Sequence, residues 1–189
     1  MKRTTVLFLV GIFGLMAGCS PSREKTVNRI LGLEKRLFAP ESVSFDKVKA
    51  DSLMNLYENF IRENPKDSLS PGYLFKSANV AMNMGDGHKA IGMFDQYLRD
   101  YPEKQKAPMC MFFKGFIYEN TLHDLDKARE TYLLFIEKYP SNDFVKDAKM
   151  ALLNLGKTPE MLVHEFEIKR QANSLRVADS LLKAKKKKR

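Results

Sequence analysis

The stretch Leu134–Asn142, LFIEKYPSN, decides the fold because a closely similar sequence occurs twice more in the chain. QYLRDYPEK occupies Gln96–Lys104, and NFIRENPKD occupies Asn59–Asp67. The prolines of these three stretches are spaced by 37 and 38 residues. Each stretch has apolar residues at helical spacing and then a proline, whose ring is incompatible with a preceding helical turn. The chain therefore repeats one helix and its stop three times.

Residues at fixed distances before each proline are of the same type. Counted back from Pro65, Pro102 and Pro140, they are Phe60, Tyr97 and Phe135 at five residues, Tyr57, Phe94 and Tyr132 at eight, and Leu53, Ala90 and Ala128 at twelve. These offsets fall on one face of a helix, so they predict the buried face of the repeated helix.

A second helical pattern precedes the last two copies, at Tyr73–Met84 and Met109–Asn120. Each pattern is followed by a short turn, GDGHKA at Gly85–Ala90 and HDLDKA at His123–Ala128. Glycine and aspartate in such turns end one helix and cap the next. Each repeat is therefore helix, turn, helix and proline, and the sequence predicts an all-α fold.

This pattern resembles the tetratricopeptide repeat (TPR). The family positions, in the order small residue, Ala, aromatic and Pro, are matched by Ala78, Ala90, Phe94 and Pro102, and by Gly115, Ala128, Tyr132 and Pro140. The resemblance implies a short right-handed α-solenoid of TPR-like helix hairpins, with about three repeats of period 37–38 and capping helices at both ends. We expect its core at residues 45–156, within a helical domain at residues 26–168.

The resemblance also implies a partner-binding groove lined by the first helix of each hairpin. The corresponding positions are Phe75, Asn79, Met82, Asn83, Phe112, Phe116, Glu119 and Asn120. Asparagine amides can hydrogen-bond a peptide backbone, and the aromatic rings can hold apolar side chains. In the alternative interpretation the phenylalanines pack between helices. Both interpretations stay open for Phe112 and Phe116.

Further helices are expected outside the repeats. One is expected near Lys25–Leu37, and a last one runs from Pro159 into the C-terminal lysines. Apolar residues of that last helix can pack on the stack: Met161, Leu162 and Phe166, and further along Leu175, Ala178 and Leu182. The polar stretch KRQANS at Lys169–Ser174, between the two groups, suggests that the helix leaves the body there. Residues 169–189 form a C-terminal extension that ends in a polybasic tail.

The first eighteen residues have the form of an export signal, with Lys2 and Arg3 before the apolar run Val6–Met16. Eleven residues are too few to span a bilayer but suit a signal peptide. The run ends in LMAGCS, which resembles a bacterial lipobox and implies that Cys19 carries lipid, with residues 19–25 as a linker. Ser20 in place of Asp favours the outer membrane, facing the periplasm. The alternatives are an ordinary signal cleaved near Ala17 and a retained anchor.

The net charge of +9 is concentrated at the chain ends, so the body is nearly neutral. The basic tail consists of Lys183, Lys185, Lys186, Lys187, Lys188 and Arg189. It could bind anionic lipid or wall polymer, or it could be a solvated end. An exported chain with a neutral body is not expected to bind nucleic acid.

No motif for catalysis, metal binding or a cofactor is present in the sequence, so we expect no enzyme activity, no metal site and no cofactor. Cys110, in the apolar run MCMFF, is expected to be a buried thiol rather than a reactive one.

The function expected is a protein–protein interaction scaffold of the bacterial cell envelope, with a protein or peptide of an envelope complex as partner. The chain is similar in type to the TPR lipoprotein of the outer-membrane β-barrel assembly machinery and to the periplasmic TPR coordinator associated with Tol–Pal. A structural tether that binds through the basic tail is the alternative.

Overall fold

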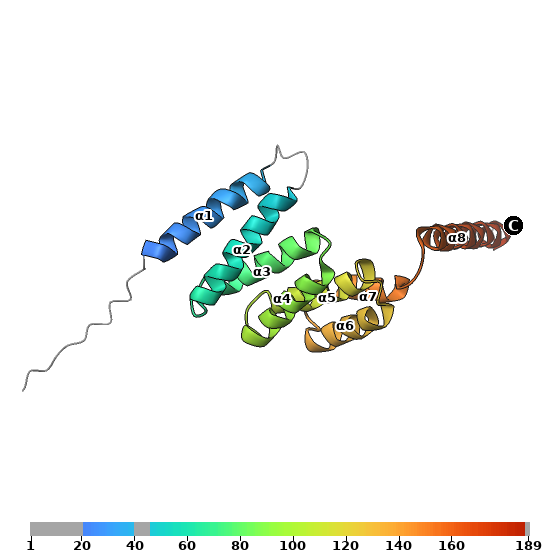
Figure 1. Ribbon diagram of the computed structural model, residues 1–189. Coiled ribbons are helices and arrows are strands. Elements are labelled where there is room, and N and C mark those ends of the chain that lie inside the picture. The colour runs from blue at the N-terminus through green and yellow to red at the C-terminus, as the bar shows by residue number, and fades with distance from the viewer. Residues whose placement is uncertain (1–20, 40–45, 188–189) are drawn as a thin grey trace, which may run out of the picture. The chain divides into compact units, whose positions relative to one another are not determined.

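The computed structural model describes residues 21–39 and 46–187, and the described residues form eight helices and no strand (Figure 1). In chain order the helices are α1 (Pro21–Leu37), α2 (Lys47–Glu63), α3 (Ser70–Asn83), α4 (Gly87–Asp100), α5 (Ala107–Asn120), α6 (Leu125–Lys138), α7 (Val145–Asn154) and α8 (Pro159–Lys187). The all-α prediction is confirmed.

The chain divides into two compact parts, residues 1–56 and 57–189, and the boundary falls within α2. The described portion of the first part holds α1 and the beginning of α2. Ile30 and Leu37 of α1 are buried, and they lie seven residues apart on one face of the helix. Because α1 begins at Pro21, most of the expected linker, residues 19–25, is already helical. Proline suits the first position of a helix, where its missing N–H has no helical partner.

The second part is a stack of helix hairpins in which α3 packs on α4, α5 on α6, and neighbouring hairpins on each other. The aromatic residues repeated before each proline form its core. Two sets of these residues are almost completely buried. Eight positions before the prolines these are Tyr57, Phe94 and Tyr132, and five positions before them they are Phe60, Tyr97 and Phe135. The prediction of a repeated buried face is confirmed, and the fold is a TPR-like solenoid.

The loops after α2, α4 and α6 close with the same backbone hydrogen bonds. In the first bond of each loop, Asn64 N donates to Phe60 O at 2.8 Å, Tyr101 N donates to Tyr97 O at 2.8 Å, and Tyr139 N donates to Phe135 O at 2.9 Å. Asp67, Lys104 and Asn142 then donate to the carbonyls of Asn64, Tyr101 and Tyr139 at 3.0–3.1 Å. These bonds satisfy helix-end carbonyls that would otherwise lack partners. The repeat in the sequence is therefore also a repeat in hydrogen bonding.

Close approach within the second hairpin depends on Gly115 of α5. A Cβ atom at this position would lie 2.6 Å from Cε1 of the Tyr132 ring on α6. Tyr132 is buried and cannot move into solvent. The small residue of the repeat therefore makes room for the aromatic residue of the facing helix.

The turns inside the first two hairpins share one construction. Gly85 has φ of 81° and His123 has φ of 54°, and each is followed by an aspartate that caps the next helix. Asp86 accepts from Lys89 N and Asp124 accepts from Lys127 N, both at 3.1 Å. A left-handed residue followed by a cap therefore reverses the chain in each hairpin.

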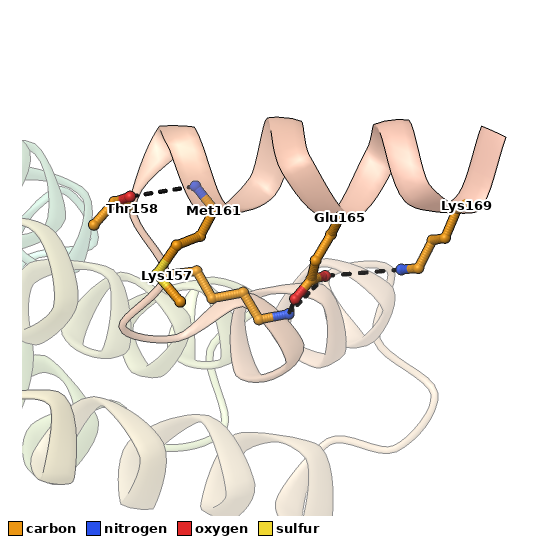
Figure 2. Close-up of polar contacts among 5 residues, drawn as sticks. All are labelled: Lys157, Thr158, Met161, Glu165 and Lys169. Atoms are coloured by element: carbon orange, nitrogen blue, oxygen red, sulfur yellow. Dashed lines mark hydrogen bonds and ion pairs between the residues drawn. The ribbon is translucent and has the colours of Figure 1, made fainter. Parts of the chain in front are cut away.

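The connection from α7 to α8 differs from these turns by one residue. Gly156 has φ of 82°, but Lys157 stands between it and the capping residue Thr158, whose Oγ1 accepts from Met161 N at 3.3 Å. The Lys157 ammonium pairs with Glu165 of α8, with Nζ 2.8 Å from Oε1 (Figure 2). The connection has the same length as the one between α5 and α6, and it differs in that the left-handed residue does not stand directly before the helix cap.

Helix α8 does not pack on the stack as the sequence led us to expect. Met161, Leu162, Phe166 and Leu175 are all exposed, and Phe166 keeps 66% of its surface accessible. The prediction that these residues cover the stack is wrong, since they and Ala178 all remain accessible on α8. The side chain of Leu182 lies outside the described residues. The helix itself, from Pro159 into the lysines, is confirmed. No helix in the described residues has both the length and the apolar character needed to cross a membrane.

Candidate partner-binding face

The residues predicted to line a groove all lie on α3 and α5, but they have three different environments. Phe75 of α3 is buried between helices, with its ring 6.1 Å from that of Phe94 and 6.3 Å from that of Phe113. The Lys106 ammonium lies 4.5 Å above the Phe75 ring, a cation–π distance. The structure thus places Phe75 in the core rather than on an open face.

Phe112 of α5 also packs between helices. Its ring stacks on Phe144 at 5.0 Å and lies 5.8 Å from the rings of both Tyr132 and Phe135. Aromatic pairs at these distances contribute beyond their buried area. Of the two interpretations of Phe112, the structure therefore favours packing, and it joins α5, α6 and the start of α7.

Glu119 links α5 to α6 through a hydrogen bond that its carboxylate accepts. The Tyr132 hydroxyl donates to Glu119 Oε2 at 2.8 Å. Burial, together with this hydrogen bond to Glu119, raises the pKa of Tyr132. Both effects favour the neutral phenol, which keeps the donor in place. Glu119 therefore holds the hairpin together.

The remaining predicted residues are accessible to a partner. Phe116 keeps 42% of its surface exposed, Asn83 and Asn120 are exposed, and Asn79 and Met82 are half-buried. Asn120 donates to the Phe116 carbonyl at 3.0 Å, one turn earlier on α5. The accessible part of the predicted face is therefore an aromatic ring beside an amide on α5, with Asn83 at the corresponding position of α3.

The two equivalent asparagines differ in their hydrogen bonding. The Asn120 amide is partly engaged by its own helix, whereas no hydrogen bond from the Asn83 side chain is found among the described residues. On α3 it is Asn79 that donates backward, to the Phe75 carbonyl at 2.7 Å. Such bonds fix the orientation of an amide but leave its oxygen free to accept.

A pocket of about 500 Å³ lies between α2, α3 and α4 and was not predicted. Its lining residues are Glu58, Ile61, Arg62, Pro65, Leu74, Lys89, Met93, Gln96, Asp100 and Tyr101. The Lys89 ammonium lies 3.0 Å from Glu58 Oε1, and the Tyr101 hydroxyl donates to the Pro65 carbonyl at 3.4 Å. Tyr101, the aromatic residue just before Pro102, was the available signal, but its place in the repeat suggested only spacing. None of the predicted groove residues lines this pocket.

A comparison with protein families matches this stack. The family model described as tetratricopeptide repeat matches residues 73–104 and 111–142. Both segments are therefore similar to tetratricopeptide repeats, and together they cover about a third of the chain. The first matched segment comprises most of α3 and all of α4, and the second comprises most of α5 and all of α6. No curated protein matches the chain.

The two matched segments carry the candidate face on their first helices, since Asn83 lies in the first segment, and Phe116 and Asn120 lie in the second. The half repeat formed by α2 and the helix α7 lie outside the matched segments. TPRs typically serve as protein-interaction modules rather than as enzymes, so the family match supports a role in protein binding.

Cys110, near the start of α5 and one residue before the second matched segment, is a buried free thiol. Burial raises the pKa of Cys110 from 9.0 to about 12. The thiolate is the reactive form of cysteine, and it is disfavoured here at neutral pH. This environment agrees with the expectation of a packing role.

The predicted lipidation residue Cys19 and the end of the basic tail, Lys188 and Arg189, lie outside the described residues. Lys183 is exposed, and residues 185–187 form the last turn of α8. The tail is therefore helical up to Lys187.

Proposed function

We propose that the chain is a non-enzymatic interaction scaffold of the bacterial cell envelope that binds a segment of a partner protein on its first helices. The TPR match supports protein binding as the general role. The observation that carries the finer proposal is the exposed Phe116 ring beside the Asn120 amide, with Asn83 at the same place in the preceding repeat. An extended or helical peptide can place an apolar side chain on the ring and its backbone on the amides.

The packing residues next to this face keep it rigid. Phe112 is fixed by three other aromatic rings, and Glu119 is fixed by Tyr132. Because these side chains are already ordered, a peptide that binds here does not have to order them. A rigid surface on packed helices is what a scaffold needs in order to select one segment.

The experiment is a comparison of partner capture from bacterial envelopes by three forms of the full-length protein. The first is the wild type, and the second carries Asn83→Ala, Phe116→Ala and Asn120→Ala. The third is a matched control with Leu133→Ala and Leu134→Ala, which truncates two exposed apolar residues of α6. The partner identified by mass spectrometry with the wild type is expected to be lost with the triple variant and kept with the control. Equal capture by all three proteins, at unchanged thermal stability, would count against this face.

Membrane attachment through Cys19 is the second element of the proposal. It rests on the lipobox-like LMAGCS stretch, since lipid on a cysteine anchors a folded domain at the surface of a membrane. Incorporation of labelled palmitate into the wild type and its absence from a Cys19→Ala variant is the expected result. Equal labelling of both would remove the anchor from the proposal.

An alternative role is a tether that holds anionic lipid or wall polymer through the basic end of α8. The concentration of cations at the end of the sequence supports it, since each Lys or Arg near an anionic surface adds to the attraction. Deletion of residues 183–189 is expected to abolish a salt-sensitive association with anionic vesicles. Binding that does not change on deletion would leave the scaffold as the function.

A further inference from the structure

Helix α8 has a stripe of apolar residues with a period of seven. Met161, Ile168, Leu175 and Leu182 follow each other at this interval. Seven residues are close to two helical turns, so the stripe drifts by only about 20° per interval and stays on one face. Met161, Ile168 and Leu175 keep 52%, 52% and 65% of their surface exposed. The stack of the same chain does not cover this face.

The stripe is symmetric about its own centre, between Gln171 and Ala172. If a second α8 helix lies antiparallel across this point, position 161 stands opposite position 182 and position 168 opposite position 175. The small side chain of Ala172 at the centre allows two helices to approach closely. The apolar pattern thus fits a reversed copy of itself.

The charges of α8 favour the same antiparallel arrangement. About the centre between Gln171 and Ala172, position 160 stands opposite position 183 and position 167 opposite position 176, which brings Glu160 to Lys183 and Glu167 to Arg176. Each of these pairs joins a carboxylate and a cation. In a parallel pair each residue would lie beside its own copy, and like charges repel each other.

We propose that the chain forms a homodimer through an antiparallel pairing of two α8 helices along this stripe. The inference goes beyond the scaffold function and does not depend on the face of α3 and α5. The binding partner of this face is a second copy of α8, because the apolar stripe and the charged residues both match a reversed copy of themselves. An isologous interface, formed by the same surface of both subunits, requires this. The helix has 29 residues, a length of about 44 Å at the usual rise per residue. With one large apolar residue per seven, the pair is weaker than a coiled coil with two, so we expect a dissociation constant in the micromolar range.

The first test is analytical ultracentrifugation of the full-length chain in detergent over a range of concentrations. The wild type is expected to show a monomer–dimer equilibrium that weakens as salt is raised. Ile168→Glu is expected to raise the dissociation constant at least tenfold. Phe166→Glu is the control, because Phe166 is as exposed but lies about 160° away around the same helix. A wild type that remains monomeric at every concentration overturns the proposal, as does equal weakening by both substitutions at unchanged helix content.

The second test decides the direction of pairing by disulfide formation in a Cys19→Ser background. His164→Cys and Ala178→Cys stand almost opposite each other in the antiparallel pair, on the same side of the stripe. A mixture of the two variants is expected to cross-link, whereas each variant alone is not. Cross-linking of each variant with itself overturns the proposal, because identical positions lie about 15 residues apart along the antiparallel pair. The buried Cys110 does not compete for cross-linking in the folded protein.

Discussion

Replacing Gly115 by alanine tests the repeat at its tightest contact. The added methyl group would lie 2.6 Å from Cε1 and 2.7 Å from Cδ1 of the Tyr132 ring. Both distances are shorter than carbon atoms tolerate, so the ring must shift. The ring has nowhere to go, because it is buried, packs against Phe112 and donates its hydroxyl proton to Glu119.

The expected loss of stability follows from three contributions. Overpacking a buried site costs about 1–3 kcal/mol, and losing a hydrogen bond to a carboxylate costs about 1.5–3 kcal/mol. Alanine has a higher helix propensity than glycine, which returns about 1 kcal/mol. Gly115→Ala should therefore lower the free energy of unfolding by about 1.5–5 kcal/mol.

Urea unfolding followed by circular dichroism measures this effect, and Gly92→Ala is the matched control. Gly92 lies inside α4, and a Cβ atom there meets no other atom within 4 Å. The control should gain about 0.5–1 kcal/mol from propensity alone. If Gly115→Ala shifts the urea midpoint upward like Gly92→Ala, the account of the hairpin contact is wrong.

Three further predictions concern single side chains. Cys110 should resist iodoacetamide in the native protein and react after unfolding. Because burial raises the pKa of Cys110 from 9.0 to about 12, the free energy of unfolding should also fall as the pH rises between these two values. Urea midpoints measured at several pH values test this. Tyr132→Phe removes the hydrogen bond to Glu119 and should destabilise the fold by about 1–2 kcal/mol in urea, whereas Glu119→Gln, which keeps an acceptor, should cost less. Asp124→Ala should lower the melting temperature, since Asp124 caps α6. The side-chain hydrogen bond from Lys127 holds the pKa of Asp124 below its usual 3.8. The difference in melting temperature between wild type and variant should therefore be present at neutral pH and vanish below pH 3.8 in melts at decreasing pH.

The sequence predicted the hairpins well because their signals are local. Proline stops, aspartate caps and aromatic residues at fixed offsets determine where each helix ends and which face it buries. The residues five and eight positions before each proline, such as Phe94 and Phe135, are buried as expected. These signals depend on neighbours within one hairpin, and the sequence shows those neighbours directly.

The face open to a partner was harder to predict because the first helix of a hairpin is apolar on several sides. Met111, Phe112 and Phe113 are consecutive in α5, so periodicity does not say which of them faces the core. The structure turns Phe112 toward the neighbouring hairpin and leaves Phe116 exposed. Whether a ring packs or remains open depends on residues such as Phe144, which are distant in sequence.

The exposure of α8 was not predictable from its apolar residues. Residues such as Met161 and Phe166 were expected on the stack because they are apolar, and both are exposed. The pattern shows that a face is apolar but does not name the surface that covers it.

The identical hydrogen bonds in the three loops have a consequence for how such a chain changes in evolution. The main helix contacts run between sequence neighbours, and each loop presents the next hairpin with the same junction. A duplicated or deleted segment of 37 or 38 residues leaves every other junction as it was. The length of the stack can therefore change by whole hairpins, and new surface arises without redesign of the core.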